Sequence, residues 1–269
     1  TLRQALDLRE QIEEVLFGLV QVEVRESNFE RALRYAERLR EDVPDKALGL
    51  ITMGDLYMGM RDAQRAVGAY EQALEQERTR DLVVKAQRAY TAVGDPVKAE
   101  AVLRGWLADN PIDSTIHRAL ASQLLNAGEL QRAVDEYNNI IERFGEAADV
   151  LNNLAWLYQQ LGDAKMEETA ELAYQIDPES PAILDTLGWI LVAENLDIKR
   201  GVILLEQAAQ RQPDDGDIRY HLAYALHANG RTSAAERELR AVLDRDFDFP
   251  ARAQALNLLE QIQSGSTAN

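Results

Sequence analysis

The amino-acid sequence predicts an all-α solenoid of about seven stacked helix hairpins, and two regular spacings predict it. Glycines recur at intervals of 34 residues, at Gly94, Gly128 and Gly162, and Gly230 follows two intervals later. Prolines recur at about two intervals, at Pro44, Pro111 and Pro178, and Pro213 follows 35 residues later. A fixed period of this length is typical of chains in which one small structural unit is repeated and stacked.

The repeated unit is clearest in residues 148–178. An apolar segment with helical spacing comes first, and a Leu-Gly-Asp turn at residues 161–163 follows it. A second segment with helical spacing ends at Asp177, because the residue before a proline is disfavoured in a helix. Two helices that share one apolar face cannot bury it alone, so each hairpin must pack on the next.

The period divides the chain into seven units that differ mainly in their turns. Ser27 and Asn28 stand where later units have Gly-Asp, and Gly145 replaces the closing proline of the fourth unit. The fifth unit is one residue short, and the sixth is one residue long near residues 195–197. The units span residues 13–46, 47–79, 80–113, 114–147, 148–180, 181–215 and 216–249.

The two ends of the chain extend this array. Residues 1–12 are helical by pattern, and residues 251–263 form an amphipathic helix that we expect to cap the stack. Residues 264–269 are polar and are expected to lack order. We expect residues 1–263 to form a single array and, because the chain starts at Thr1, we interpret it as a fragment of a longer protein.

Small residues recur at the positions of the unit where two helices must approach closely. Glycine or alanine occupies the eighth position, at Gly54, Ala121, Ala155, Gly188 and Ala223. Alanine occupies the twentieth position, at Ala32, Ala66, Ala99, Ala133 and Ala235. Glycine at the fifteenth position turns the chain between the two helices of one hairpin.

The composition excludes several classes of partner. A formal net charge of −17 and a pI near 4.6 argue against nucleic acid and against anionic lipid, since both are bound by clusters of Lys and Arg. The chain has no cysteine, which excludes disulfides, a thiolate zinc site and a cysteine nucleophile. No apolar run reaches membrane-spanning length, so we expect no direct membrane insertion by this chain.

The sequence also lacks the patterns that carry catalysis. Its histidines are His117, His221 and His227, and none belongs to a His-Glu-x-x-His motif. No carboxylate triad has metal-ligand spacing, and no glycine-rich phosphate loop follows a strand. We therefore expect no catalytic residues, no metal and no cofactor.

These repeats resemble the tetratricopeptide repeat. The shared pattern is a Leu-Gly/Ala-x-x-Tyr first helix, a Gly-Asp turn, Ala-x-x-x-Tyr/Leu-x-x-Ala in the second helix and a closing Asp-Pro. The resemblance covers nearly the whole chain and implies a right-handed α-solenoid whose concave wall is made by the first helix of each unit. Departures from the pattern stand at Val20, Gln87, Met166 and Gly201.

The resemblance also implies which positions face the groove, namely the second, fifth, ninth and twelfth of each unit, with the sixth at the margin. In the last three units these positions carry an aromatic line, Trp156, Trp189 and Tyr224, with amide, carboxylate and imidazole neighbours. Rigid rings beside such polar groups suit an extended peptide or a sugar chain. The alternative is that the rings are core residues packed between repeats. The candidate groove residues are Asn152, Asn153, Trp156, Asp185, Thr186, Trp189, Tyr220, His221, Tyr224 and His227.

The middle units offer a second candidate site, a small basic patch of Lys85, Arg88 and Arg118. Such a patch could hold an acidic segment or a carboxylate. The alternative is that these are ordinary solvated charges on helix surfaces.

Residues 180–192 and 200–244 are similar to bacterial repeat proteins of the exosortase (PEP-CTERM) sorting system, exported lipoproteins associated with exopolysaccharide production. They resemble more loosely the repeat domains of polysaccharide-secretion outer-membrane proteins. These resemblances imply a periplasmic or outer-membrane-associated scaffold, with a cytoplasmic location left open. The expected partner is a protein segment or an exopolysaccharide in the groove. We expect a monomer, with self-association through residues 1–12 as the alternative.

Overall fold

The computed structural model describes residues 12–43, 46–245 and 248–265, and every regular element in these ranges is a helix. The residues 1–11 and 266–269, for which we predict a helix and a tail without order, lie outside the described ranges. The helices are α2 (Ile12–Arg25), α3 (Phe29–Asp42), α4 (Leu48–Gly59), α5 (Ala63–Gln76), α6 (Arg80–Ala92), α7 (Pro96–Asp109), α8 (Ser114–Asn126), α9 (Leu130–Phe144), α10 (Ala148–Leu161), α11 (Lys165–Ile176), α12 (Pro181–Ala193), α13 (Ile198–Arg211), α14 (Gly216–Ala228), α15 (Thr232–Leu243) and α16 (Arg252–Gln263).

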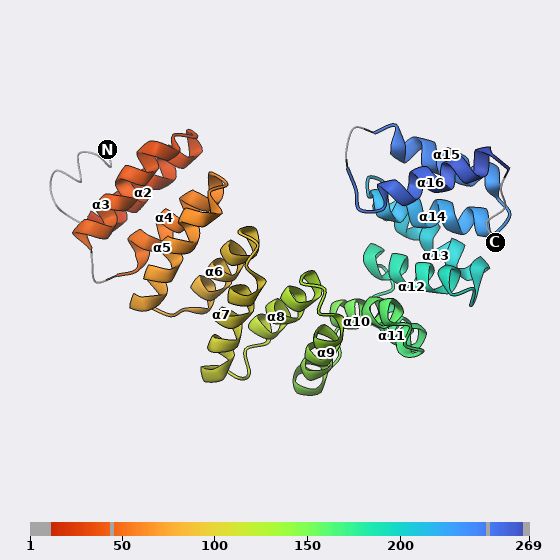
Figure 1. The fold of residues 1–269 in the computed structure, drawn as a ribbon, viewed down its shortest axis with the longest axis horizontal. Coiled ribbons are helices and arrows are strands. Elements are labelled where there is room, and N and C mark those ends of the chain that lie inside the picture. Colours follow the sequence, from red (N-terminus) through yellow and green to blue (C-terminus); the bar gives the residue numbers. More distant parts are fainter. Residues whose placement is uncertain (1–11, 44–45, 246–247, 266–269) are drawn as a thin grey trace. The chain divides into compact units, whose positions relative to one another are not determined.

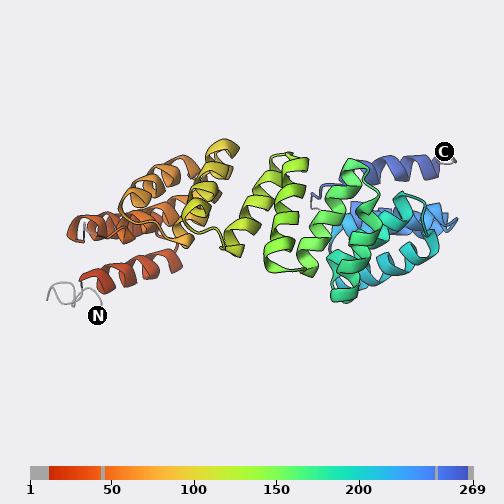
Figure 2. The same ribbon diagram turned by 90° about the horizontal axis from the view of Figure 1, so that it is seen from below.

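Consecutive helices lie side by side in pairs, such as α2 with α3 and α14 with α15, and α16 follows the last pair (Figure 1; Figure 2). The fold class predicted from the sequence, an all-α array of helix hairpins closed by one more helix, is confirmed. The chain divides into two compact units, residues 1–136 and residues 137–269, which we call the N-terminal unit and the C-terminal unit. The assignment of residues 1–263 to one domain stays a prediction.

Aspartate side chains begin many of these helices. The carboxylate of Asp95 accepts from the Lys98 N–H at 3.0 Å, and that of Asp197 accepts from the Arg200 N–H at 3.0 Å. Each bond satisfies a backbone donor that has no partner within its helix, and the negative charge lies at the positive end of the helix dipole. The same arrangement occurs at Asp62, Asp113 and Asp215.

The turn between the two helices of a hairpin uses one left-handed residue at the fifteenth position of the unit. Gly94 has a φ of 77° and Gly162 a φ of 67°. Where the sequence has no glycine there, the same conformation is kept at a cost by another residue, at Ser27, Arg61 and Asn195 with φ of 59°, 61° and 55°.

This turn gives a first prediction. We expect Arg61→Gly to raise the free energy of unfolding by about 0.5–1 kcal/mol, because glycine removes the Cβ strain of the left-handed region. Gly94→Ala is the matched control and should lower it by a similar amount, since a Cβ at Gly94 has nothing within 4 Å and only the backbone conformation changes. Urea denaturation of both variants measures the two effects. Equal effects of the same sign would contradict this account of the turn.

Small residues allow the two helices of each hairpin to approach closely. A Cβ built on Gly54 would lie 2.4 Å from the ring of Tyr70, which packs against it. A Cβ on Gly188 of α12 would lie 3.1 Å from the Gly201 carbonyl oxygen of α13. Gly201, a departure from the repeat pattern, is therefore matched to Gly188 across the hairpin. The predicted alanines at the eighth and twentieth positions are buried as expected.

In the C-terminal unit the first helices of neighbouring repeats contact one another. Thus α10 contacts α12, α12 contacts α14, and α14 contacts α16. The second helices α11, α13 and α15 instead contact the first helix of the following repeat. The helices α10, α12, α14 and α16 therefore form one continuous wall, which we call the inner wall of the C-terminal unit.

Candidate functional site

Four rings from two helices gather on this inner wall. Trp189 of α12 stacks on the His221 ring of α14 with centroids 4.3 Å apart and an interplanar angle of 24°. Its ring meets Tyr224 edge-on at 5.2 Å and lies 6.0 Å from Tyr220. The Tyr220 and Tyr224 rings are 6.4 Å apart. We call Trp189, Tyr220, His221 and Tyr224 the aromatic cluster.

Two carboxylates lie beside the aromatic cluster. The His221 Nδ1 is 2.9 Å from Asp185 Oδ1 and 3.0 Å from Asp185 Oδ2, so the carboxylate fixes the orientation of the imidazole. Asp217, in the first turn of α14, accepts from the backbone N–H of Ala251 at 2.8 Å. Burial raises the pKa of Asp217, and the negative charges of Asp215 and Asp185 add to that rise, while the Ala251 N–H and His221 oppose it.

The three side chains of the aromatic line differ in their solvent exposure. Trp156 of α10 is 39% exposed, as the groove prediction requires. Trp189 and Tyr224 are half-buried, because they pack on each other and because Tyr224 also contacts the apolar core on both sides of α14. The two rings thus combine the groove and core interpretations, because each is partly packed in the structure and partly exposed.

The other predicted groove residues lie on α10, α12 and α14 outside this cluster. Asn153 donates to the Tyr137 hydroxyl at 3.1 Å, and the His227 Nδ1 is 3.3 Å from the Thr232 hydroxyl oxygen. Thr186 is half-buried. The Oδ1 atom of Asn152 is buried and accepts no hydrogen bond from the described residues. The structure therefore brings together Asp185, Trp189, Tyr220, His221 and Tyr224, whereas Trp156 and His227 make no ring contact with that cluster within the described residues.

The helix that we predict as a cap also contributes to the wall. A pocket of about 420 Å³ lies between α14 and α16, with Tyr220 and Tyr224 on one side. Its other side is formed by α16, which contributes Ala253 and Leu258 as apolar lining residues. The α16 residues are not among the predicted site residues, although Gln254 and Gln261 follow Tyr220 and His227 by one period of 34. The polar α16 residues of the pocket are Gln254, Asn257 and Gln261.

The predicted basic patch in the N-terminal unit has counter-charges of its own. The Lys85 ammonium lies 2.7 Å from an Asp55 oxygen and 3.5 Å from an Asp81 oxygen. Burial alone would lower the pKa of Lys85, but these two carboxylates outweigh it and the pKa is raised. Arg88 is exposed, and Arg118 is half-buried and has an interaction of its own. Lys85 is therefore committed to a neighbouring repeat rather than available as an open anion site.

The charged side chains on the inner wall are mostly acidic. The four helices of the wall carry four acidic residues and two basic ones, namely Asp149, Asp185, Asp217 and Glu260 against Arg219 and Arg252. Arg219 pairs with Glu238 of α15 at 2.5 Å and donates to the Pro213 carbonyl at 3.1 Å. Arg219 is therefore paired within its own hairpin. The wall around the aromatic cluster presents carboxylates and aromatic rings.

Two features are absent from the part of the chain that the structure describes. It contains no group of three or more His, Asp or Glu side chains placed to hold a metal ion. None of its helices is both long enough and apolar enough to cross a membrane. The arrangement on the inner wall can offer ring faces, carboxylates, amides and one oriented imidazole to a ligand.

Comparisons with known proteins agree with this architecture. Two tetratricopeptide repeat family models match, one over residues 118–181 and the other over residues 198–262. A search of curated proteins finds none that matches the sequence.

Solved structures of similar fold cover most of the chain. A tetratricopeptide repeat protein from Parabacteroides merdae ATCC 43184 shares 14% identity over 94% of this chain and 100% of its own, with a TM-score of 0.71. The C-terminal part of a repeat protein from Cytophaga hutchinsonii shares 13% identity over 90% of this chain and 99% of its own, with a TM-score of 0.61. A thermophilic repeat protein from Thermus thermophilus shares 18% identity over 68% of this chain and 100% of its own, at a TM-score of 0.55.

At such low identity these structures show the fold alone. The family models, the repeat positions and the paired helices lead to the same assignment. Residues 118–181 and 198–262 are tetratricopeptide repeats, and the helix hairpins of the described residues have the tetratricopeptide-repeat fold.

Proposed function

We propose that this chain is a non-catalytic scaffold that holds an extended segment of a partner protein against the inner wall of the C-terminal unit. The observation that carries the proposal is the aromatic cluster on α12 and α14, continued by the pocket of about 420 Å³ toward α16. Rings that are rigid and partly exposed supply apolar contact area at a small entropic cost. Amide and carboxylate groups beside them can pair with the backbone of an extended chain.

We also propose the assembly and the cellular location in which this scaffold acts. The similarity of residues 180–192 and 200–244 to exosortase-system repeat proteins supports a role in a bacterial envelope assembly for exopolysaccharide or protein sorting, in the periplasm or at the outer membrane. We propose that the chain acts there as a monomer. A light-scattering mass near 30.2 kDa that does not change with concentration is the expected result, and a mass that rises with concentration would favour self-association.

A sugar chain is the second candidate ligand. The exposed face of Trp156 and the amides of Gln254 and Asn257 are groups that stack on and hydrogen-bond to sugar rings. Titration of the chain with purified exopolysaccharides, followed by tryptophan fluorescence, tests this candidate. A saturable change that Trp156→Ala abolishes would support it, and no change at any polymer concentration would exclude it for those polymers.

The test of the main proposal uses a displayed library of random peptides selected on the immobilised chain. We expect Trp156→Ala combined with Tyr224→Ala to weaken the selected peptides at least about tenfold, because truncating central aromatic contacts usually costs more than about 1.4 kcal/mol. Fluorescence anisotropy of labelled peptides measures the affinities. Since Trp156 is 39% exposed, its replacement alone should lower the free energy of unfolding by about 1–2 kcal/mol, less than the roughly 3–5 kcal/mol typical of a fully buried tryptophan.

The matched control is Ile203→Ala, which removes an exposed apolar side chain from α13. This variant should bind the peptides like the unmodified chain. Peptides that bind the Trp156→Ala and Tyr224→Ala variant as tightly as the original would show that the segment binds elsewhere. A large loss of stability in Trp156→Ala would instead support the core interpretation of that side chain.

A further inference from the structure

The rings of the aromatic cluster differ from other aromatic rings of this chain in one respect. Several rings elsewhere have a cation of the same chain placed over them, and the cluster has none among the described residues. The Arg65 guanidinium lies 4.7 Å from the Tyr57 ring centre, and the Lys98 ammonium lies 5.5 Å from that of Tyr90. Similar contacts occur at Tyr158, Tyr174 and Phe249.

The cluster also has negative charge close to its rings. Asp185 orients His221, which stacks on Trp189, so this carboxylate lies at the edge of the ring stack. The Asp185 and His221 side chains keep 15% and 19% of their accessible surface, so a ligand can still reach them. Asp217 is one helical turn from His221, and its described partner is a backbone N–H rather than a cation. Ring faces and carboxylates both favour a positive charge.

No cation of the wall itself satisfies this preference among the described residues. The wall helices carry two Lys or Arg residues: Arg219 of α14 pairs with Glu238 on α15, and Arg252 of α16 lies 6.0 Å from the Phe249 ring centre and donates to the Leu243 carbonyl at 3.2 Å. The whole chain carries a net charge of −17, which adds a long-range attraction for positive segments. The site and its surroundings therefore favour a positively charged ligand.

We propose that the segment held on the inner wall is basic, and that an arginine side chain of it lies against Trp189, Tyr220 and Tyr224 with its guanidinium near Asp185 and Asp217. This inference rests on the proposed function and names the chemistry of the partner. Arginine fits better than lysine, because the flat guanidinium stacks on rings and offers paired donors to a carboxylate. Acidic or uncharged segments have no comparable group for these carboxylates.

The experiment begins with the library-selected peptides described above, bound to the unmodified chain of residues 1–269. We expect arginine to be enriched in them, and replacement of that arginine by citrulline, which keeps the shape and removes the charge, to weaken binding at least about tenfold. Replacement by lysine should have an intermediate effect. These measurements use the unmodified chain and do not depend on the folding of any variant.

A protein-side variant, Asp185→Asn with Asp217→Asn, should also weaken the arginine peptide about tenfold or more. Asparagine keeps the oxygen acceptors for His221 and for the Ala251 N–H, so the melting temperature is expected to stay close to that of the unmodified chain. The matched control is Glu167→Gln with Glu168→Gln, which removes the same charge from the exposed first turn of α11. It should bind within about twofold of the original, which separates the site from general attraction to an acidic protein.

Three outcomes decide the inference. Enrichment of arginine with sensitivity to Asp185 and Asp217, but not to Glu167 and Glu168, supports it. Peptides that depend on Trp156 and Tyr224 yet lack arginine, or equal losses in both charge variants, overturn the inference and leave the proposed function standing. Absence of any peptide that depends on the inner wall, or binding of a sugar polymer there instead, overturns both.

Discussion

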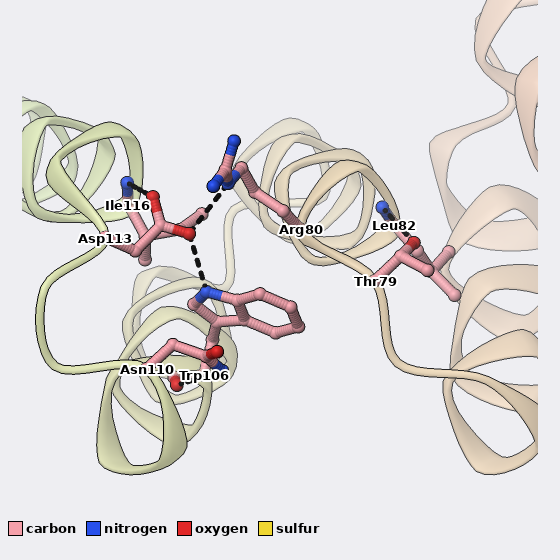
Figure 3. A network of polar contacts seen from close by, with 7 residues as sticks. All are labelled: Thr79, Arg80, Leu82, Trp106, Asn110, Asp113 and Ile116. Atoms are coloured by element: carbon pink, nitrogen blue, oxygen red, sulfur yellow. Dashed lines mark hydrogen bonds and ion pairs between the residues drawn. The ribbon is translucent and has the colours of Figure 1, made fainter.

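Replacing Asp113 by alanine is expected to lower the free energy of unfolding of the N-terminal unit by about 3 kcal/mol. The Asp113 side chain is 5% exposed and joins three elements of the stack (Figure 3). Its carboxylate accepts from Arg80 Nε of α6 at 2.7 Å and from the Trp106 indole N–H of α7 at 2.9 Å. It also caps α8 through the Ile116 N–H at 3.3 Å. Alanine would leave all three donors without this acceptor.

The effect should depend on pH. Burial alone would raise the pKa of Asp113, but hydrogen bonds from Arg80, Trp106 and the Ile116 N–H outweigh it, so the folded-state pKa lies below the ordinary 3.8. A lowered folded-state pKa means that this stabilisation is present above about pH 4 and is lost as the pH falls toward the folded-state value. The difference between the unmodified chain and Asp113→Ala should therefore shrink in acid.

Urea denaturation followed by circular dichroism at neutral and acid pH measures this difference. Asp95→Ala is the control, since Asp95 is half-buried, caps α7 and makes no described hydrogen bond to another repeat. It should cost about 1 kcal/mol. If the loss for Asp113→Ala were no larger than the loss for Asp95→Ala, the link between helices would contribute nothing beyond a helix cap.

Replacing Gly188 by leucine is expected to lower the free energy of unfolding of the C-terminal unit by about 3 kcal/mol or more. A Cβ there would lie 2.8 Å from Leu205 Cγ, 3.1 Å from the Gly201 carbonyl oxygen and 3.3 Å from Leu204 Cβ. Any larger side chain must push α13 away from α12 and disturb the hairpin that carries Trp189. The backbone contact to Gly201 cannot be relieved by a side-chain rotation.

Gly68→Leu is the matched control, because it makes the same substitution within a helix where a Cβ has nothing within 4 Å. Leucine is a better helix former than glycine, so this variant should be equally stable or more stable by up to about 1 kcal/mol. Thermal and urea unfolding of both variants measure the effects. A Gly188→Leu variant as stable as Gly68→Leu would mean that the two helices do not require close approach.

The hairpins could be predicted from the sequence because their determinants are local and periodic. Glycine at the fifteenth position and alanine at the twentieth are each set by one turn or one contact that every repeat copies. The left-handed conformation of Arg61 could not be predicted, since arginine has no preference for it and takes it because the two flanking helices pack. The pairing of Gly201 with Gly188 likewise becomes visible only when the two helices are placed together.

From the sequence, the candidate site residues could be placed together only where they lie on the same helix. The spacing of Tyr220, Tyr224 and His227 puts them on one face of α14, which the sequence shows directly. The stacking of Trp189 on His221 and the Asp185–His221 pair depend on the register between α12 and α14, which no local pattern sets. The ion pairing of the basic patch could not be predicted for the same reason. The carboxylate that pairs with Lys85 is Asp55, which lies 30 residues earlier in the chain.

The central claim is that the inner wall of the C-terminal unit is the surface that meets the partner. Fluorine NMR of the chain labelled with 5-fluorotryptophan tests it directly, because the three tryptophans are Trp106, Trp156 and Trp189. On saturation with a library-selected peptide, the Trp156 and Trp189 resonances should shift, whereas Trp106, bonded to Asp113 in the N-terminal unit, should not. A saturated complex in which Trp156 and Trp189 keep their original resonances would contradict the account.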